Sequence, residues 1–280
     1  MILTRYLYSK ERVLLALLKC LSLKLEEESL YFAYELSFSG FEIEMWDCLW
    51  KHYYLYCHVL NPEYEQVLKK QEKIFLSKGD IKIIKKSIVE LIIRPYYYIG
   101  ESEMMTWSLD QLTKKYKDRT FNPYNRIKFV KIFNRPLNDF NKEVLISRIL
   151  FLENKPIINK KQFFIEVDIN ECDFYKTKEL IDEKVWKVLR NVIKYNVKDF
   201  LSEDQIKNTE SLEGINLLEN WILYAYNSPL WKNRIESFHG KKINNKIVFD
   251  DEDEEEEFWN KYNLEPDEQP ADIQNKINFN

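Results

Sequence analysis

The stretch from Phe41 to His58 constrains the fold more than any other part of the chain. Drawn as a helix, with about 100° between successive residues, it is apolar around nearly its whole circumference. One face carries Ile43, Trp46, Trp50, Tyr53, Tyr54 and Cys57. The charged stripe is confined to Glu44, Asp47, Lys51 and His58. Because a helix that is apolar nearly all round is normally surrounded by others, the stretch predicts the central helix of a helical domain.

Start and stop signals predict four more helices around this one. They run from Lys10 to Ser22 after a capping Ser9, from Leu25 to a left-handed Gly40, from Asn61-Pro62-Glu63 to Gly79, and from a capping Asp80 to Pro95. The connections between these five helices are expected to be only about two to five residues long, and connections of that length favour an antiparallel array or bundle. Further on, residues 177–193 and 214–226 show helical periodicity, residues 162–168 resemble a strand, and Lys241–Phe249 predicts a hairpin turning at Asn244-Asn245.

The expected fold class is therefore mainly α, a multi-helix array or bundle with a minor β hairpin or strand component and an acidic C-terminal tail. We expect an N-terminal helical domain over residues 1–99. A second, mainly helical part with minor β follows over residues 100–249, either separate from the first or continuous with it, and the acidic, aromatic-containing tail covers residues 250–280. Only 5 glycines and 8 prolines in 280 residues argue against a sandwich or barrel rich in tight turns.

The sequence favours a soluble intracellular protein. The N-terminus lacks the long apolar segment of a signal peptide, and the apolar run Val13–Leu18 is far too short to span a membrane. The four cysteines form no CxxC pair, so reduced thiols are expected. By composition Cys48, His52, Cys57 and His58 could ligate a metal. On one helix Cys57 projects nearly opposite Cys48, so no metal site is predicted.

No catalytic residue and no cofactor is assigned. The five glycines are too far apart for a phosphate loop or a dinucleotide fingerprint, and no GxSxG or HExxH occurs. Glu166 and Asp168 lie on one face of the predicted strand and could hold Mg²⁺ for phosphodiester cleavage. A solvated acidic edge is the favoured reading of this pair.

The charge is unevenly distributed along the chain. Residues 250–280 carry 12 acidic and 2 basic side chains, whereas the net charge of the whole chain is −4. The densest basic region lies in the body, where it is interleaved with aromatic residues and could bind phosphates and stack bases. Its basic residues are Lys114, Lys115, Lys117, Arg119, Arg126, Lys128 and Lys131. The alternative is a solvated helix face beside core aromatics.

The tail contains the candidate partner-binding residues. Eight acids from Asp250 to Glu257 precede Phe258, Trp259 and Tyr262. We expect the acidic run to be solvated and mobile. The aromatic residues then have two interpretations: they anchor an outside partner, or they pack onto the body as a terminal helix.

Three groups of short motifs carry a resemblance. They are Tyr34-Glu35-Leu36 with Ser39-Gly40-Phe41, Asn220-Trp221 with Tyr226–Trp231 and Arg234-Ile235, and Phe258-Trp259 with Lys261-Tyr262 and Glu265–Gln269. Together they resemble an uncharacterised protein family of nucleocytoplasmic large DNA viruses, the mimivirus-like group. The resemblance implies a viral protein made in the host cytoplasm, located there, in the viral factory or in the virion. It carries no catalytic residue over.

The first functional hypothesis is a non-enzymatic helical scaffold or adaptor that binds a protein partner. The alternative is a nucleic-acid-associated factor in replication, transcription or translation that binds through Lys114–Lys131. The sequence does not fix an oligomeric state, and no membrane contact is expected.

Overall fold

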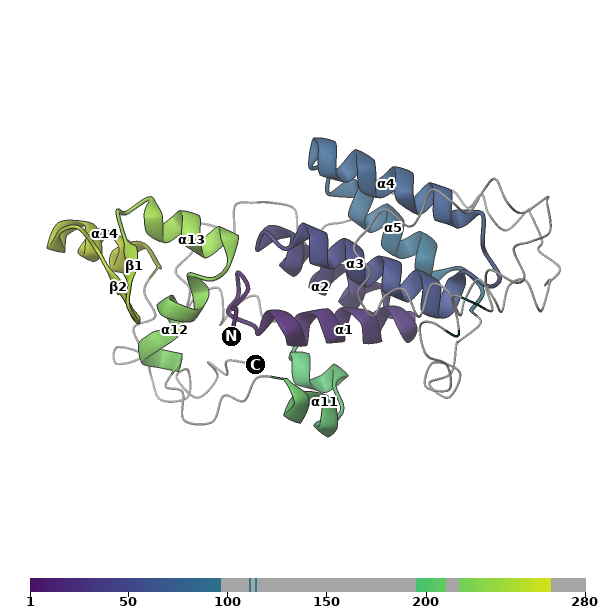
Figure 1. Cartoon of the computed structure of the whole chain (residues 1–280), viewed down its shortest axis with the longest axis horizontal. Coiled ribbons are helices and arrows are strands. Elements are labelled where there is room, and N and C mark those ends of the chain that lie inside the picture. Colours follow the sequence, from purple (N-terminus) through teal and green to yellow (C-terminus); the bar gives the residue numbers. More distant parts are fainter. Residues whose placement is uncertain (97–110, 112–113, 115–194, 210–216, 263–280) are drawn as a thin grey trace. The chain divides into compact units, whose positions relative to one another are not determined.

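The computed structural model describes residues 1–96, 111, 114, 195–209 and 217–262. This part of the chain is mainly helical and contains one small two-stranded antiparallel sheet (Figure 1). The predicted mainly α fold class with a minor β hairpin is therefore confirmed. The predicted strand over residues 162–168 and the helix over residues 177–193 lie outside the described residues. No helix in the described ranges combines the length and hydropathy needed to cross a membrane.

The chain divides into two compact units. One combines residues 1–46 with 169–280, and the other spans residues 47–168. This division differs from the three consecutive segments expected from the sequence. The physical reason is that the first residues of the chain pack with elements beyond residue 220, as described below.

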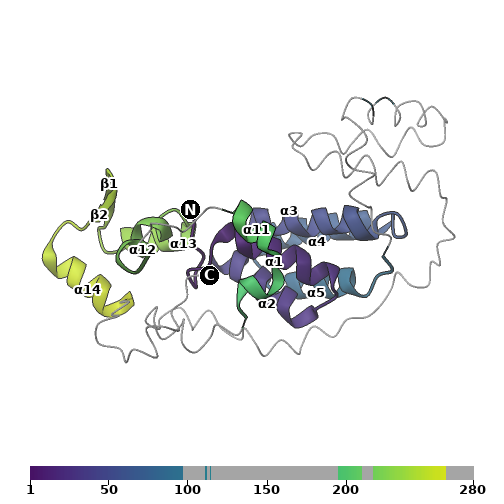
Figure 2. The ribbon, with the colours of Figure 1, turned by 90° about the horizontal axis from the view of Figure 1, so that it is seen from below.

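In the first unit, helices α1 (Lys10–Ser22) and α2 (Glu26–Phe38) pack side by side (Figures 1 and 2). Helix α1 has the predicted bounds, and Val13 and Leu17 are fully buried. Three glutamates occupy the first turn of α2, where their negative charges interact favourably with the positive end of the helix dipole. Gly40 follows α2 with a φ of 87°, as predicted. A Cβ there would lie 2.6 Å from the Pro229 Cβ, so only glycine fits.

The first nine residues form a short hairpin-like loop that is clamped onto α2. Leu3 and Ser9 form an antiparallel bridge. The Arg5 side chain donates to Glu35 Oε2 from Nε and Nη2 at 3.3 and 3.2 Å. The amide of Tyr6 donates to Glu35 Oε1 at 2.8 Å, and the amide of Arg5 to Ser39 Oγ at 2.7 Å. The buried Glu35 therefore accepts from both the side chain and the backbone of this loop.

Helix α3 (Glu42–His52) continues into a π-helical turn, Tyr53–Cys57. The predicted helix over residues 41–58 is thus present, and most of its aromatic side chains are buried. Two placements were wrong. Ile43, expected on the buried face, is 67% exposed, whereas His58, expected on the charged stripe, is 3% exposed. The His58 amide bonds to Tyr53 O at 2.8 Å. Because a π turn closes on the fifth residue instead of the fourth, it rotates His58 inward.

The second unit continues with α4 (Tyr64–Lys78) and α5 (Lys82–Ile92), which pack against each other. α4 ends at Gly79, as predicted, and Gly79 adopts the left-handed conformation. The N-cap position of α5 is Ile81 and not Asp80, as was expected, although Asp80 Oδ1 accepts from the Lys82 amide at 3.0 Å. Asn61 does not cap α4. Its side chain is buried and donates to Cys57 O and Pro95 O, so α4 begins only at Tyr64.

The remaining described elements belong to the first unit. A 3₁₀ turn (Val197–Phe200) precedes α11 (Glu203–Asn208), which starts with a capping box formed by Ser202 and Gln205. Then follow α12 (Leu217–Ala225), α13 (Pro229–Glu236), strands β1 (Lys241–Ile243) and β2 (Lys246–Val248), and α14 (Glu252–Tyr262). Pro229 opens α13 directly behind the capping Ser228.

Candidate functional site

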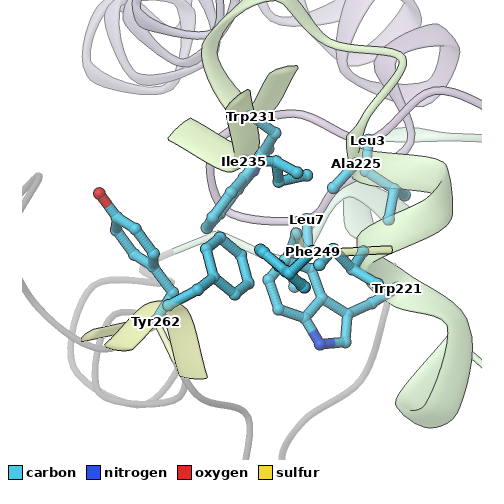
Figure 3. Close-up of a cluster of buried hydrophobic side chains, with 10 residues drawn as sticks. Leu3, Leu7, Trp221, Ala225, Trp231, Ile235, Phe249 and Tyr262 are labelled. Carbon is cyan, nitrogen blue, oxygen red and sulfur yellow. The ribbon is translucent and has the colours of Figure 1, made fainter. Parts of the chain in front are cut away.

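Elements α12, α13, the β1–β2 hairpin and α14 form what we call the C-terminal module. They are joined by a buried apolar cluster to which the N-terminal loop also contributes (Figure 3). Its buried members are Leu3, Leu7, Trp221, Ile222, Ala225, Trp231, Ile235, Phe249, Phe258 and Tyr262. Trp231 Nε1 donates to Thr4 O at 3.1 Å, so the N-terminal loop is bonded to this cluster as well as packed on it.

Aromatic contacts hold α14 to the rest of the module. The Trp221 and Phe258 rings are stacked with centroids 6.5 Å apart, and the Trp231 and Tyr262 rings meet edge to face at 5.6 Å. Trp221 and Trp231 themselves meet at 5.1 Å. In Figure 3 the Tyr262 ring lies against this group with its hydroxyl directed outward. Because such pairs add roughly 0.5–1.5 kcal/mol each beyond area burial, the two anchors fix α14 firmly.

The three predicted partner-binding residues are therefore not equivalent. Phe258 is 0% and Tyr262 4% exposed, so both pack as part of a terminal helix, the second of the two interpretations above. Trp259 is half-buried, and its Nε1 donates to Glu255 Oε1 at 3.1 Å. An outside partner could reach only Trp259 without opening the core.

The acidic run from Asp250 to Glu257 is solvated, as expected, but most of it is helical. Asp251 Oδ1 accepts from the Glu254 amide at 2.8 Å and caps the first turn of α14. The acids of α14 occupy its first two turns, where carboxylates interact favourably with the helix dipole. The aromatic residues that follow at one-turn spacing supply the burial that the acids cannot. A charged run can therefore form a helix when its next turn is anchored.

The hairpin presents a second, oppositely charged surface. Its register pairs Lys241 with Val248, Lys242 with Ile247, and Ile243 with Lys246. Because directly opposed residues share a face, Lys241, Ile243, Lys246 and Val248 lie on one side of the sheet. Ile247, on the other side, packs against the apolar cluster. Ile243 and Val248 are 53% and 44% exposed, so the outer face of the hairpin is an aliphatic strip between lysines.

Two polar contacts connect the base of the hairpin to the start of the acidic run. Lys241 Nζ lies 2.8 and 2.9 Å from the two carboxylate oxygens of Asp250, and His239 Nδ1 lies 2.8 Å from Glu254 Oε1. The hydrogen bond from Lys241 lowers the pKa of the Asp250 carboxyl. Lys242 and Lys246, nearer the tip, make no ion pair with any described residue. Figure 2 shows the hairpin and α14 as separate projections.

The charge of the module is consequently divided between two surfaces. Residues 228–249 contain five basic and one acidic side chain, and residues 250–262 contain eight acidic and one basic. The acidic run Asp250–Glu257 was identified from the sequence, whereas the hairpin lysines were missed. The signal was present as lysines alternating with Ile243, Ile247 and Val248 after a predicted turn. The module can offer a partner opposite charges on neighbouring surfaces.

The other predicted residues are placed as follows. Lys114 is an exposed helical residue, whereas Lys115, Lys117, Arg119, Arg126, Lys128 and Lys131 lie outside the described residues, as do Glu166 and Asp168. The π turn brings Cys57 Sγ within 3.9 Å of His52 Nε2. Both side chains are fully buried. Within the described ranges, no three His, Cys, Asp or Glu side chains gather as metal ligands.

Comparisons with protein-family models, with curated proteins and with solved structures found no match to this chain.

Proposed function

We propose that the protein is a helical scaffold that binds protein partners through its C-terminal module. The observation that carries this proposal is the pairing of an aliphatic, lysine-flanked hairpin face with an acidic helix on one aromatic core. Exposed aliphatic residues rimmed by charge are typical of interaction surfaces. The core holds both surfaces in fixed positions, which lowers the entropy lost on binding. Viral origin and a cytoplasmic location belong to the same proposal.

The partner whose chemistry fits is a second copy of the chain. In a two-fold dimer the same patch contacts itself, so α14 of each copy can face the hairpin of the other. The acids of α14 would then lie near Lys246, on the outer face of the hairpin, and near Lys242, which is exposed on the opposite face. Neither lysine has a carboxylate partner in the described part of its own chain.

The aliphatic strip supplies affinity and the charges supply orientation. Burying Ile243 and Val248 removes about half of each side chain from water, worth about 1–2 kcal/mol per residue. Complementary charges mainly raise the association rate and fix the register, and salt screens them. Dimerisation is therefore expected to weaken as ionic strength rises.

A charge exchange tests the proposal on the full-length protein. One variant carries Lys242→Glu and Lys246→Glu, and the other carries Glu256→Lys and Glu257→Lys. The hairpin variant alone opposes like charges in both halves of the dimer. The α14 variant leaves six of the eight acids and places two cations near the partner's hairpin lysines, so each variant alone is expected to associate more weakly than the wild type. In an equimolar mixture both contacts become attractive, so a heterodimer is expected. Sedimentation velocity at low salt measures all three states.

The control variant carries Lys69→Glu and Lys70→Glu on the exposed face of α4, which makes the same charge change in the other unit. It should associate like the wild type. A wild type that stays monomeric at tens of micromolar, or a mixture that stays monomeric, contradicts self-association. If the control variant also associates more weakly than the wild type, the weakening reflects the net charge of the protein and not the proposed interface.

A further inference from the structure

Helix α4 separates its charged side chains between its inner and outer sides. Its two acids, Glu65 and Glu72, are both buried. Glu72 accepts a hydrogen bond from Trp50 Nε1 at 3.1 Å, and Glu65 Oε2 lies 3.8 Å from His58 Nε2. The four lysines of the helix are all exposed: Lys69, Lys70, Lys73 and Lys78. The carboxylates that could balance these lysines along the helix are therefore used inside the second unit.

Helix α5 packs along one side of α4 (Figure 1), and three of the lysines gather on an exposed arc. With about 100° between successive helical residues, Lys73 lies about 40° and Lys70 about 100° around the helix from Lys69. Gln66 and Ser77 fall within the same arc and are exposed and neutral. No acid of α4 shares this arc, which we call the lysine arc.

The lysine arc places like charges next to each other. Lys69 and Lys73 are spaced i, i+4, and Lys70 and Lys73 are spaced i, i+3, and like charges at such spacings destabilise a helix. None of the three forms an ion pair with a described residue. The exposed acids nearest in the chain, Glu63 and Asp80, lie beyond the two ends of α4. An anionic partner would remove the repulsion that the helix itself leaves uncompensated.

The uncharged residues of α4 indicate which kind of polyanion fits. Both aromatic residues of the helix, Tyr64 and Phe75, are buried, so the helix offers no ring on which the bases of a single strand could stack. The exposed Val67 and Leu76 lie about 180° apart around the helix. They form no continuous apolar strip of the kind that inserts into a membrane surface. What remains is a set of cations and neutral donors, which suits phosphates alone.

We propose that Lys69, Lys70 and Lys73 bind the phosphate backbone of double-helical nucleic acid. Lys69 and Lys73 are about 6 Å apart along the axis of α4, whereas the phosphates of one strand follow each other at about 3.4 Å along a duplex. The two ammonium groups can therefore contact separate phosphates. Because backbone contacts carry no sequence information, binding is expected to be independent of sequence. The surface lies in the second unit and does not depend on the proposed scaffold function.

Fluorescence anisotropy of the full-length protein with a labelled DNA duplex of about 20 base pairs tests the proposal between about 50 and 200 mM salt. The wild type should bind, and its affinity should fall as salt rises. The variant with Lys69→Gln, Lys70→Gln and Lys73→Gln should bind at least about tenfold more weakly at low salt, with a salt slope shallower by roughly 2–3.

The matched control carries Lys19→Gln, Lys207→Gln and Lys232→Gln, which remove three exposed positive charges from the first unit. It has the same net charge as the lysine-arc variant and should keep the wild-type slope. A variant with arginine at the three arc positions keeps the charge and should bind like the wild type.

A second measurement needs no variant. Acetylation of the wild type by a lysine-specific reagent, read by mass spectrometry, should show Lys69, Lys70 and Lys73 protected by the duplex and Lys19 still reactive. The proposal is overturned if the wild type does not bind the duplex at low salt, if the arc lysines stay reactive, or if the glutamine variant keeps its slope. Tighter binding to a single strand of equal length, or binding to phosphatidylserine vesicles and not to the duplex, also overturns it.

Discussion

Two aromatic-rich helical segments of this protein use their aromatic residues differently. The segment formed by α3 and its π turn is buried on most of its circumference, whereas α14 buries only Phe258 and Tyr262 and exposes most of its acids. The α3 segment is surrounded by other parts of the protein, whereas α14 contacts its core only through the face that carries Phe258 and Tyr262. The number of buried faces, and not the number of aromatic residues, therefore determines how much of the fold depends on a helix.

The polar atoms of the two segments show the same difference. Trp50 Nε1 donates to the buried Glu72 at 3.1 Å and Tyr53 Oη to Asn61 O at 2.9 Å, so the aromatic residues of the first segment are also bonded inside the second unit. Trp259 Nε1 bonds only within α14, to Glu255. Losing a side chain from the first segment would leave buried polar partners behind.

The largest expected contrast is in thiol reactivity. Burial raises the pKa of Cys48, on α3, to about 12, so very little thiolate exists at pH 8. A cysteine introduced at the exposed Asn260 of α14 should have an ordinary pKa. Alkylation of Asn260→Cys should be at least about 10³-fold faster than that of Cys48. Mass spectrometry after timed quenching measures both rates, and comparable rates would show that α3 opens readily.

Trp50→Ala tests the first segment directly. Truncating a buried tryptophan costs about 3–5 kcal/mol, and here Glu72 is left without its donor. We expect a melting temperature lowered by several degrees, or a protein that does not fold, as measured by circular dichroism. Ile43→Ala, at the exposed position of the same helix, is the matched control and should melt like the wild type. Unchanged melting of Trp50→Ala would mean that α3 is not buried as described.

Phe258→Ala tests the aromatic face through which α14 packs on the apolar cluster. Loss of this buried ring should cost about 3 kcal/mol and lower the melting temperature less than Trp50→Ala does. Trp259→Ala, on the neighbouring half-buried position, should have the smaller effect of the two. Truncation before residue 250 removes Phe258 and Tyr262 together, so it should destabilise the first unit. The sequence alone suggested the opposite, namely that the body stays folded without the tail. A truncated protein with wild-type melting would contradict this packing.

Lys241→Ala should have the smallest effect. The contact between Lys241 and Asp250 lies on the surface, where water and salt screen it. We expect the melting temperature to change by less than about 1 °C. The same variant should raise the pKa of Asp250 toward its ordinary value, because its hydrogen-bond donor is lost. Carboxyl titration by NMR measures that change, and an unchanged Asp250 pKa would show that the contact is absent in solution.

Local signals in the sequence predicted the local structure well. The bounds of α1, the left-handed Gly40, the end of α4 at Gly79 and the hairpin turning at Asn244 all follow from residues within a few positions of each other. The errors came from distant partners. Asn61 Nδ2 donates to Cys57 O and Pro95 O and does not cap α4. For the same reason the sequence could not decide between its two interpretations of the tail, in which Phe258 stacks on the distant Trp221.

The clamp on the first nine residues has a consequence for the order of folding during synthesis. Trp231 Nε1 bonds to Thr4 O, a partner 227 positions earlier in the chain. At a translation rate of about 5–20 residues per second, the N-terminal loop waits roughly 10–45 s for that partner. The unit of residues 47–168 is synthesised entirely within this interval. The unit that contains the first residue is therefore the last to be completed, and Leu3 and Leu7 stay exposed to chaperones until it is.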